Sequence, residues 1–240
     1  MDGFTYTNIF ATKGIEYIAI LSFFALLIPF WFMLSKQVKV NREIKRSLGL
    51  LTAASLRIPK GLFFSKFHSW THLEPTGLAK VGIDDFLVKI TGDIMLTQVK
   101  KVGDYVSKGE LLLTLSNEGK SLDILSPITG EIISSNQSLL QDPELLFSDP
   151  YTTGWVYRIQ PENWIAETTD FMLGKDAGQW YAHELERFRD FMGKSAGEHA
   201  PEMSQAVLQD GGELMEHSMA MMPKEIWADF QSEFLGNGNG

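Results

Sequence analysis

Few side chains in this sequence have the chemistry of a reactive site. The 240 residues include no cysteine, which excludes disulfides, thiol nucleophiles and cysteine-ligated metals. His68 and His72 are potential metal ligands, but no further acid–histidine pair lies near them at metal-ligand spacing. The sequence shows no Ser-His-Asp set and no phosphate-binding loop. We therefore expect a protein that is not an enzyme, in which both histidines have structural roles.

A second candidate is Lys120, which lies beside a predicted hairpin. It directly follows Asn117-Glu118-Gly119, a good turn sequence because glycine can adopt a positive φ. Apolar stretches at residues 109–115 and 122–125 flank this turn. Lys120 is therefore either an ordinary exposed turn lysine, which we favour, or the attachment point of a carried group.

The region that positions this hairpin, residues 56–164, has the pattern of many short strands joined by tight turns. Short apolar stretches alternate there with Gly, Pro, Asn and Asp. Residues 84–90 are expected to form a short helix that Asp84 caps. The expected strands are residues 78–83, 93–99, 109–115, 122–125, 130–135 and 154–159. This pattern predicts a mainly-β domain with a flattened antiparallel sandwich or barrel.

Short motifs in the same region resemble those of one known family. They are His68-x-Trp70, Val81-Gly82-Ile83-Asp84, Gly92-Asp93-Ile94, Val102-Gly103-Asp104-x-Val106, Asp123-Ile124-x-Ser126-Pro127-x-x-Gly130-Glu131 and Ser148-Asp149-Pro150-Tyr151-x-x-Gly154-Trp155. Taken together, the stretch from His68 to Trp164 resembles the H protein of the glycine cleavage system. That resemblance implies a lipoyl/biotinyl-type β-sandwich whose family carries lipoate on one lysine.

The carrier lysine of that family has no counterpart at the expected position. In the family it lies ten residues after the glycine that opens the hairpin and four residues before the aspartate. Counting forward from Gly109 and back from Asp123 both give Gly119, and Lys120 is one residue late. A shift of one residue turns a side chain to another face. We therefore expect no lipoate, with Lys120 as the less favoured lipoyl site.

Residues 17–35 are expected to form a transmembrane helix. This run is uncharged, and about 20 residues cross the hydrocarbon core of a bilayer. Basic residues follow the run in a predicted helical stalk at residues 36–55. By the positive-inside rule, residues 1–16 should lie outside the cell and the β-domain in the cytoplasm. The sequence thus predicts a single-pass protein of the cell (inner) membrane that contacts the lipid bilayer.

The tail at residues 165–240 is acidic and is expected to be helical and partly disordered. It holds 14 acidic and 5 basic residues, which account for the whole formal charge of −9. Aromatic residues recur in it at helical spacing, which indicates amphipathic helices. Such helices bind grooves of partner proteins or remain solvated. We expect the first role, with contacts through Trp180, Phe188, Phe191, Trp227, Phe230 and Phe234.

Together these features predict a membrane-anchored, non-lipoylated protein that acts as an interaction subunit of a membrane complex. Analogy of fold alone suggests that this complex is a redox assembly. The first alternative is a lipoyl carrier of glycine cleavage, or of a related dehydrogenase system, that uses Lys120. The second is an assembly factor that binds lipoyl enzymes without being modified. Nucleic acid is not an expected partner, because the charge balance provides no basic face.

Overall fold

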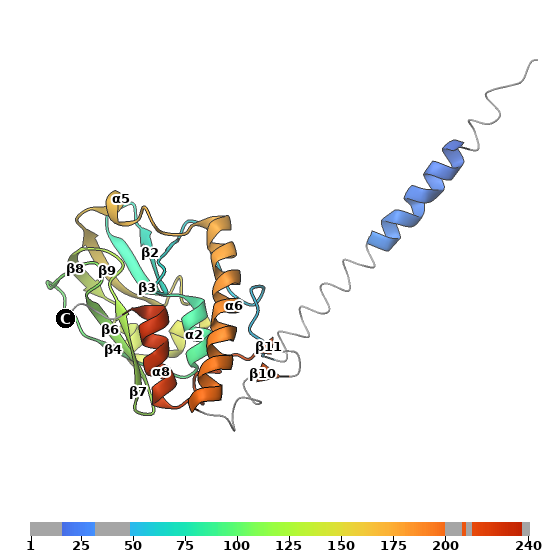
Figure 1. The fold of residues 1–240 in the computed structure, drawn as a ribbon. Coiled ribbons are helices and arrows are strands. Elements are labelled where there is room, and N and C mark those ends of the chain that lie inside the picture. The colour runs from blue at the N-terminus through green and yellow to red at the C-terminus, as the bar shows by residue number, and fades with distance from the viewer. Residues whose placement is uncertain (1–15, 32–48, 200–207, 210–212, 237–240) are drawn as a thin grey trace, which may run out of the picture. The chain divides into compact units, whose positions relative to one another are not determined.

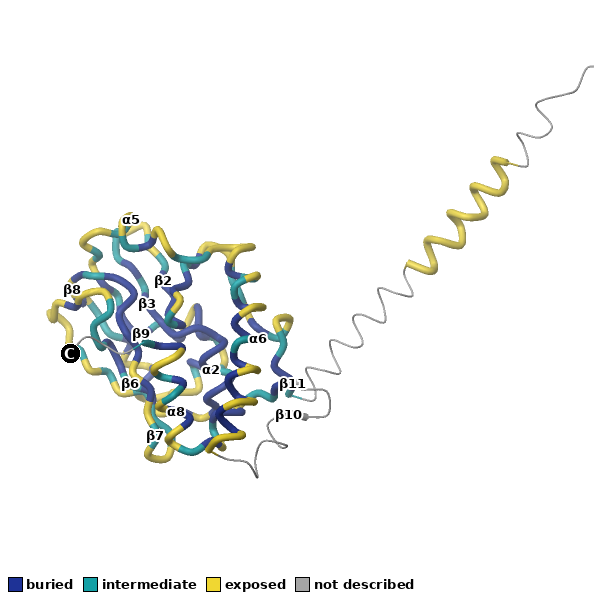
Figure 2. Tube along the Cα trace, viewed as in Figure 1, coloured by how far each residue is buried: buried dark blue, intermediate teal, exposed yellow. Residues whose placement is uncertain are grey.

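The computed structural model describes residues 16–31, 49–199, 208–209 and 213–236 (Figure 1). The chain divides into two units, residues 1–48 and residues 49–240. In the first unit residues 16–31 form one helix, and all of its residues are exposed (Figure 2). Among the helices in the described ranges, none is long and apolar enough to cross a membrane. Residues 32–35 of the predicted span lie outside the described residues.

The predicted stalk helix is wrong where it can be compared with the structure. Residues 36–48 lie outside the described residues, but residues 49–55 contain turns and an isolated bridge from Leu50 to Met215. Gly49 has a φ of 66°, a left-handed backbone conformation that a residue inside a right-handed helix does not adopt. Backbone bonds from Leu51 N to Leu214 O and from Glu216 N to Gly49 O, both 2.8 Å, connect this segment to the C-terminal part of the chain.

Two antiparallel sheets form the centre of the second unit, as the strand pattern predicts. The first has the order β1-β2-β3-β9-β8-β5 and the second β4-β6-β7. The strands of the first sheet are β1 (Phe63–Phe64), β2 (Ser69–Leu73), β3 (Ala79–Ile83), β9 (Trp155–Pro161), β8 (Gly130–Ser135) and β5 (Tyr105–Val106). Those of the second are β4 (Met95–Gln98), β6 (Leu111–Asn117) and β7 (Lys120–Leu125). The short strands β10 (Leu208–Gln209) and β11 (Glu213–Leu214) pair separately.

Helices lie around these sheets (Figure 1). The short ones are α2 (Asp85–Thr91), α3 (Ser138–Gln141), α4 (Glu144–Ser148) and α5 (Trp164–Glu167). The C-terminal ones are α6 (Gly174–His199), α8 (Lys224–Phe230) and the π-helical turn η1 (Gln231–Leu235). Asp84 caps α2 as predicted, because its side chain accepts a hydrogen bond from the Leu87 backbone N–H.

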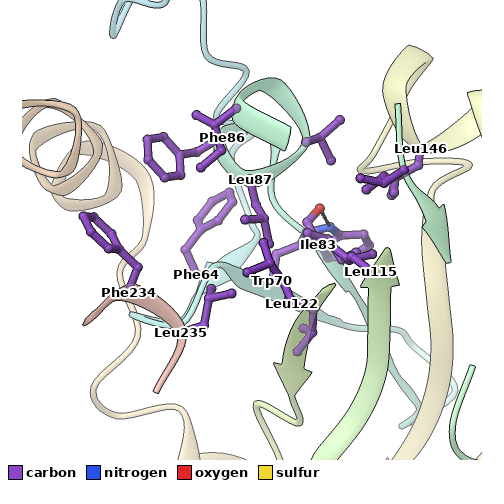
Figure 3. Packing of buried hydrophobic residues seen from close by; sticks show 14 of the residues in the cluster. Phe64, Trp70, Ile83, Phe86, Leu87, Leu115, Leu122, Leu146, Phe234 and Leu235 are labelled. Carbon is purple, nitrogen blue, oxygen red and sulfur yellow. Dashed lines mark hydrogen bonds between the residues drawn. The ribbon is translucent and has the colours of Figure 1, made fainter. Parts of the chain in front are cut away.

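The core forms where the strands alternate inward-facing apolar residues and the helices cover them. Trp70 is fully buried, and its indole N–H donates to the Ile83 carbonyl at 3.0 Å. Gly82 makes room for this ring, since a Cβ there would lie 2.6 Å from it. Figure 3 shows Phe234 and Leu235 of η1 on either side of the Phe64 label, in the same cluster as Phe86. The residues after 164 thus contribute to the core of the β-domain.

Candidate functional site

The hairpin that the sequence analysis singled out has a two-residue turn. Strands β6 and β7 pair antiparallel, and their last paired residues are Asn117 and Lys120. Glu118 and Gly119 therefore form the turn, with φ of 46° and 84°. Positive φ at both positions is the pattern of a type I′ hairpin, in which glycine is favoured second. No atom lies within 4 Å of a Cβ added at Gly119, so backbone conformation rather than crowding favours glycine there.

Lys120 does not extend freely from this turn. It is the first residue of β7 and is half-buried. Its ammonium group donates a hydrogen bond to the carbonyl of Ala220 at 2.5 Å and lies 5.3 Å from the centre of the Trp227 ring. A cation over an indole face is attracted to it. The structure therefore engages the candidate carrier lysine with the C-terminal part of its own chain.

A cleft of about 640 Å³ lies beside the hairpin tip. The hairpin supplies one wall, and the segment around His217 and Ala220 supplies another. Met95 and Met221 also line it and are 72% and 56% exposed. The Asn117 side-chain amide donates to the Asp93 carbonyl at 2.5 Å and so fixes the hairpin to the loop after α2. The tip thus has a fixed position beside an open surface.

A buried ionic cluster around His68 lies apart from the hairpin. The His68 ring is fully buried, with Nδ1 2.8 Å from Asp84 Oδ2 and Nε2 3.2 Å from Glu184 Oε1. The Tyr181 hydroxyl donates to the same Asp84 oxygen at 2.7 Å, and Arg187 pairs with Glu184 at 3.0 Å. Burial alone would lower the pKa of His68, but the two carboxylates outweigh it and raise that pKa to about 9. His68 is therefore a charged link between the β-domain and α6.

The prediction that both histidines are structural agrees with their contacts. The His72 ring Nδ1 lies 3.2 Å from the Gly61 carbonyl, and no acidic side chain among the described residues pairs with it. Within the described ranges, no group of three His, Cys, Asp or Glu residues is placed to hold a metal ion. The sequence analysis missed Glu184 as the partner of His68. Glu184 lies on the apolar side of α6, and a charged residue in such a position is the signal that could have identified it as the partner of a buried cation.

The expectation of a partner-binding face on the tail needs correction. Phe188, Phe191, Trp227, Phe230 and Phe234 are all at most 5% exposed, and Trp180 is half-buried against the core. They face the β-domain of the same chain: the Phe188 ring contacts Phe86 of α2, and α8 and η1 lie against β7. The four phenylalanine side chains and that of Trp227 are therefore packed within the chain and a partner cannot use them while this packing holds, whereas Trp180 keeps part of its surface exposed.

Comparison with known proteins identifies the domain. The model of the "Glycine cleavage H-protein" family matches residues 62–184, about half of the chain. The chain belongs to this family. The match includes His68, the hairpin and Glu184, at which it ends. It thus covers both ends of the buried ionic link as well as the candidate carrier position.

The relatives of this family member are bacterial and archaeal H proteins. The "Glycine cleavage system H protein" of Psychrobacter sp. (strain PRwf-1) is 36% identical over 106 residues, covering 44% of this chain and 84% of the relative. That of Hydrogenovibrio crunogenus is 32% identical over 119 residues, covering 50% and 92%. A solved H protein from Mycobacterium marinum is 29% identical, with a TM-score of 0.44 over 51% of this chain and 98% of that one. The family resemblance predicted from the sequence motifs is confirmed.

Proposed function

We propose that this chain performs an H-protein-type function as a protein-binding component of a larger assembly, without catalysing a reaction itself. Membership of the glycine cleavage H-protein family supports this role. The side chains of interest at both places are held by contacts within the chain: His68 by Asp84, and Lys120 by Ala220. A domain of this kind acts by presenting a surface to other proteins.

In the form that we favour, the domain carries no lipoate. The observation that supports this is Gly119 in the turn, at the position of the family's carrier lysine. The neighbouring Lys120 is turned toward Ala220 and Trp227 instead of away from the domain. A lysine held in this way lacks the reach of a free carrier arm.

The alternative is a lipoyl carrier that uses Lys120. The similarity to glycine cleavage system H proteins supports this alternative better than an unmodified domain. In this version the side chain of Lys120 must leave the Ala220 carbonyl and the Trp227 ring before it can be modified. Glycine cleavage, or a related dehydrogenase system, is the pathway that this version implies.

Intact-mass measurement of protein purified from its native membrane separates the two versions. We expect the mass of the unmodified chain. A gain of one lipoyl group that maps to Lys120 by peptide analysis would establish the alternative. The Lys120→Arg variant is the matched control, since it keeps the charge but cannot form the lipoyl amide.

We also propose that residues 17–35 anchor the chain in the cell membrane, with the β-domain in the cytoplasm beside other subunits of a membrane complex. The uncharged run and the basic residues that follow it support this placement. Protease treatment of sealed right-side-out and inverted vesicles tests it. Cleavage of the β-domain only in inverted vesicles is expected, and cleavage only from the outside would reverse the proposed orientation.

A further inference from the structure

The cleft beside the hairpin tip is built partly by residues that lie outside the matched family domain. The family model ends at residue 184, whereas His217, Ala220 and Met221 form one wall of the cleft. The loop after α2 and the hairpin itself form the other walls. Its volume of about 640 Å³ lies within the range of ligand-binding clefts. The cleft is therefore a feature of this chain, because the family domain alone lacks one of its walls.

The wall that the C-terminal part supplies is fixed to α2 by backbone hydrogen bonds. The His217 N–H donates to the Lys89 carbonyl at 2.6 Å, and the Met219 N–H donates to the Ile90 carbonyl at 2.9 Å. The Lys89 side chain also pairs with Glu216. A site whose walls are already ordered loses little conformational entropy when it binds. The cleft is thus preformed, and occupying it requires no movement of the C-terminal segment.

Two methionine side chains give the cleft exposed apolar surface. Met95 is 72% exposed and Met221 is 56% exposed, and they belong to different walls. Methionine is flexible and polarizable, so a methionine surface adapts to side chains of different shapes. Burying such surface against another apolar group is favourable. The cleft is therefore suited to an apolar side chain that enters between the two methionines.

The cleft also has acidic groups that no residue of this chain neutralises. Asp93 and Glu118 line it and are exposed, and neither carboxylate has an ion-pair or hydrogen-bond partner among the described residues. None of the described lining residues is a lysine or an arginine, and the third titratable one is His217. The nearby ammonium group of Lys120 is bonded to the Ala220 carbonyl. A complementary ligand therefore carries positive charge.

We propose that this cleft is the docking site for a segment of a partner protein that carries a lysine or arginine next to an apolar side chain. The apolar side chain packs between Met95 and Met221, and the cationic group pairs with Asp93 and Glu118. This inference rests on the proposed H-protein-type role as a protein-binding component, and it deepens that role by giving the chemistry of the partner.

Binding of two short peptides to the purified full-length chain tests the proposal. Both probes are capped tetrapeptides, one of alternating leucine and lysine and the other of alternating leucine and glutamate. The methyl NMR signals of labelled methionines report binding, with the fully buried Met192 as internal reference. We expect the lysine peptide to shift the Met95 and Met221 signals saturably and to bind about tenfold more tightly than the glutamate peptide. Equal affinities, or no shift of these two signals, would overturn the proposal.

Variants that neutralise single carboxylates assign the effect to the cleft. Glu118→Gln and Asp93→Asn should each weaken binding of the lysine peptide about threefold, as expected for exposed ion pairs. Glu131→Gln removes an exposed charge from β8 in the other sheet and should leave the affinity unchanged. Unchanged affinity in both cleft variants, or equal weakening in the control, would overturn the proposal. Such a result would leave the H-protein-type role standing, because that role is tested separately on the native protein.

Discussion

His68 Nε2 lies 3.2 Å from Glu184 Oε1, which joins the start of the β-domain to the long helix α6 across 116 positions of sequence. Both side chains are almost completely inaccessible to solvent. Removing one partner of a buried ion pair leaves an uncompensated charge, which costs far more than the pair itself contributes. The contact therefore makes the docking of α6 sensitive to the charge of a single imidazole.

Stability should fall at alkaline pH. The pKa of His68 rises from 6.5 to about 9 on folding, so the contribution of its charge is complete below about pH 6.5 and is lost as the pH rises through about 9. The melting temperature of the full chain should therefore decrease between pH 7 and pH 10. The neutral variant Glu184→Gln should show a smaller decrease over the same range. Identical pH profiles for the two proteins would contradict the role of this pair.

Replacing Glu184 by glutamine should also lower stability at neutral pH. The variant keeps the size of the side chain but removes the charge that His68 and Arg187 face. We expect a loss of about 1–3 kcal/mol in the free energy of unfolding, measured by urea denaturation. Glu186→Gln, on the exposed side of the same helix, is the control and should change stability by less than about 0.5 kcal/mol.

Truncating an aromatic residue of the tail should destabilise the β-domain itself. Phe188 is fully buried between the rings of Phe86 and Phe230. Phe188→Ala should lower the free energy of unfolding by about 3–5 kcal/mol. Ile165→Ala removes a side chain that is 83% exposed and should have little effect. A stable domain with Phe188→Ala would mean that the tail packs only loosely, which would again leave its aromatic face for a partner.

Gly119→Lys should create a substrate for a lipoyl ligase. The position is open, with no atom within 4 Å of an added Cβ, so the new side chain points into free space. The positive φ should cost about 1–2 kcal/mol in stability. The variant is tested with Lys120→Arg in the same chain, so that any lipoyl group found by mass spectrometry lies on residue 119.

Gly103→Lys, also with Lys120→Arg, is the matched control for that experiment. Gly103 has a φ of 91° and equally open surroundings, but it lies in a different turn. It should carry the same strain without being modified. Modification of both variants would show that the ligase accepts any exposed turn lysine, and the position of Gly119 would then carry no special meaning.

Local pattern was sufficient to predict most of the β-domain. Alternating apolar residues identified β3, β4, β6, β7, β8 and β9, and Asp84 identified the start of α2. Strands β1, β2 and β5 were missed; β1 and β5 have two residues each, too few to show a period, whereas β2 has five and its burial pattern does not alternate. The turn at Gly119 was also predictable, since its residue types are those that positive φ requires.

The residues against which the tail packs were not predictable in the same way. A stripe of aromatic residues on a helix looks the same whether it will pack on its own domain or on another protein, so Phe188 and Trp227 were assigned to the wrong neighbour. The contacts of Lys120 with Ala220 and of His68 with Glu184 join distant parts of the sequence. Only the three-dimensional arrangement decides such pairs.

The connection between residues 49–51 and residues 214–216 has a mechanical consequence. Any tension applied to the chain ahead of Gly49 reaches the folded unit first through the bonds from Leu51 N to Leu214 O and from Glu216 N to Gly49 O. Those bonds belong to the beginning of the same C-terminal stretch that holds Lys120 a few residues later. A pull at Gly49 therefore loads two routes at once: the covalent chain toward β1, and, through residues 214–216, the segment that holds Lys120.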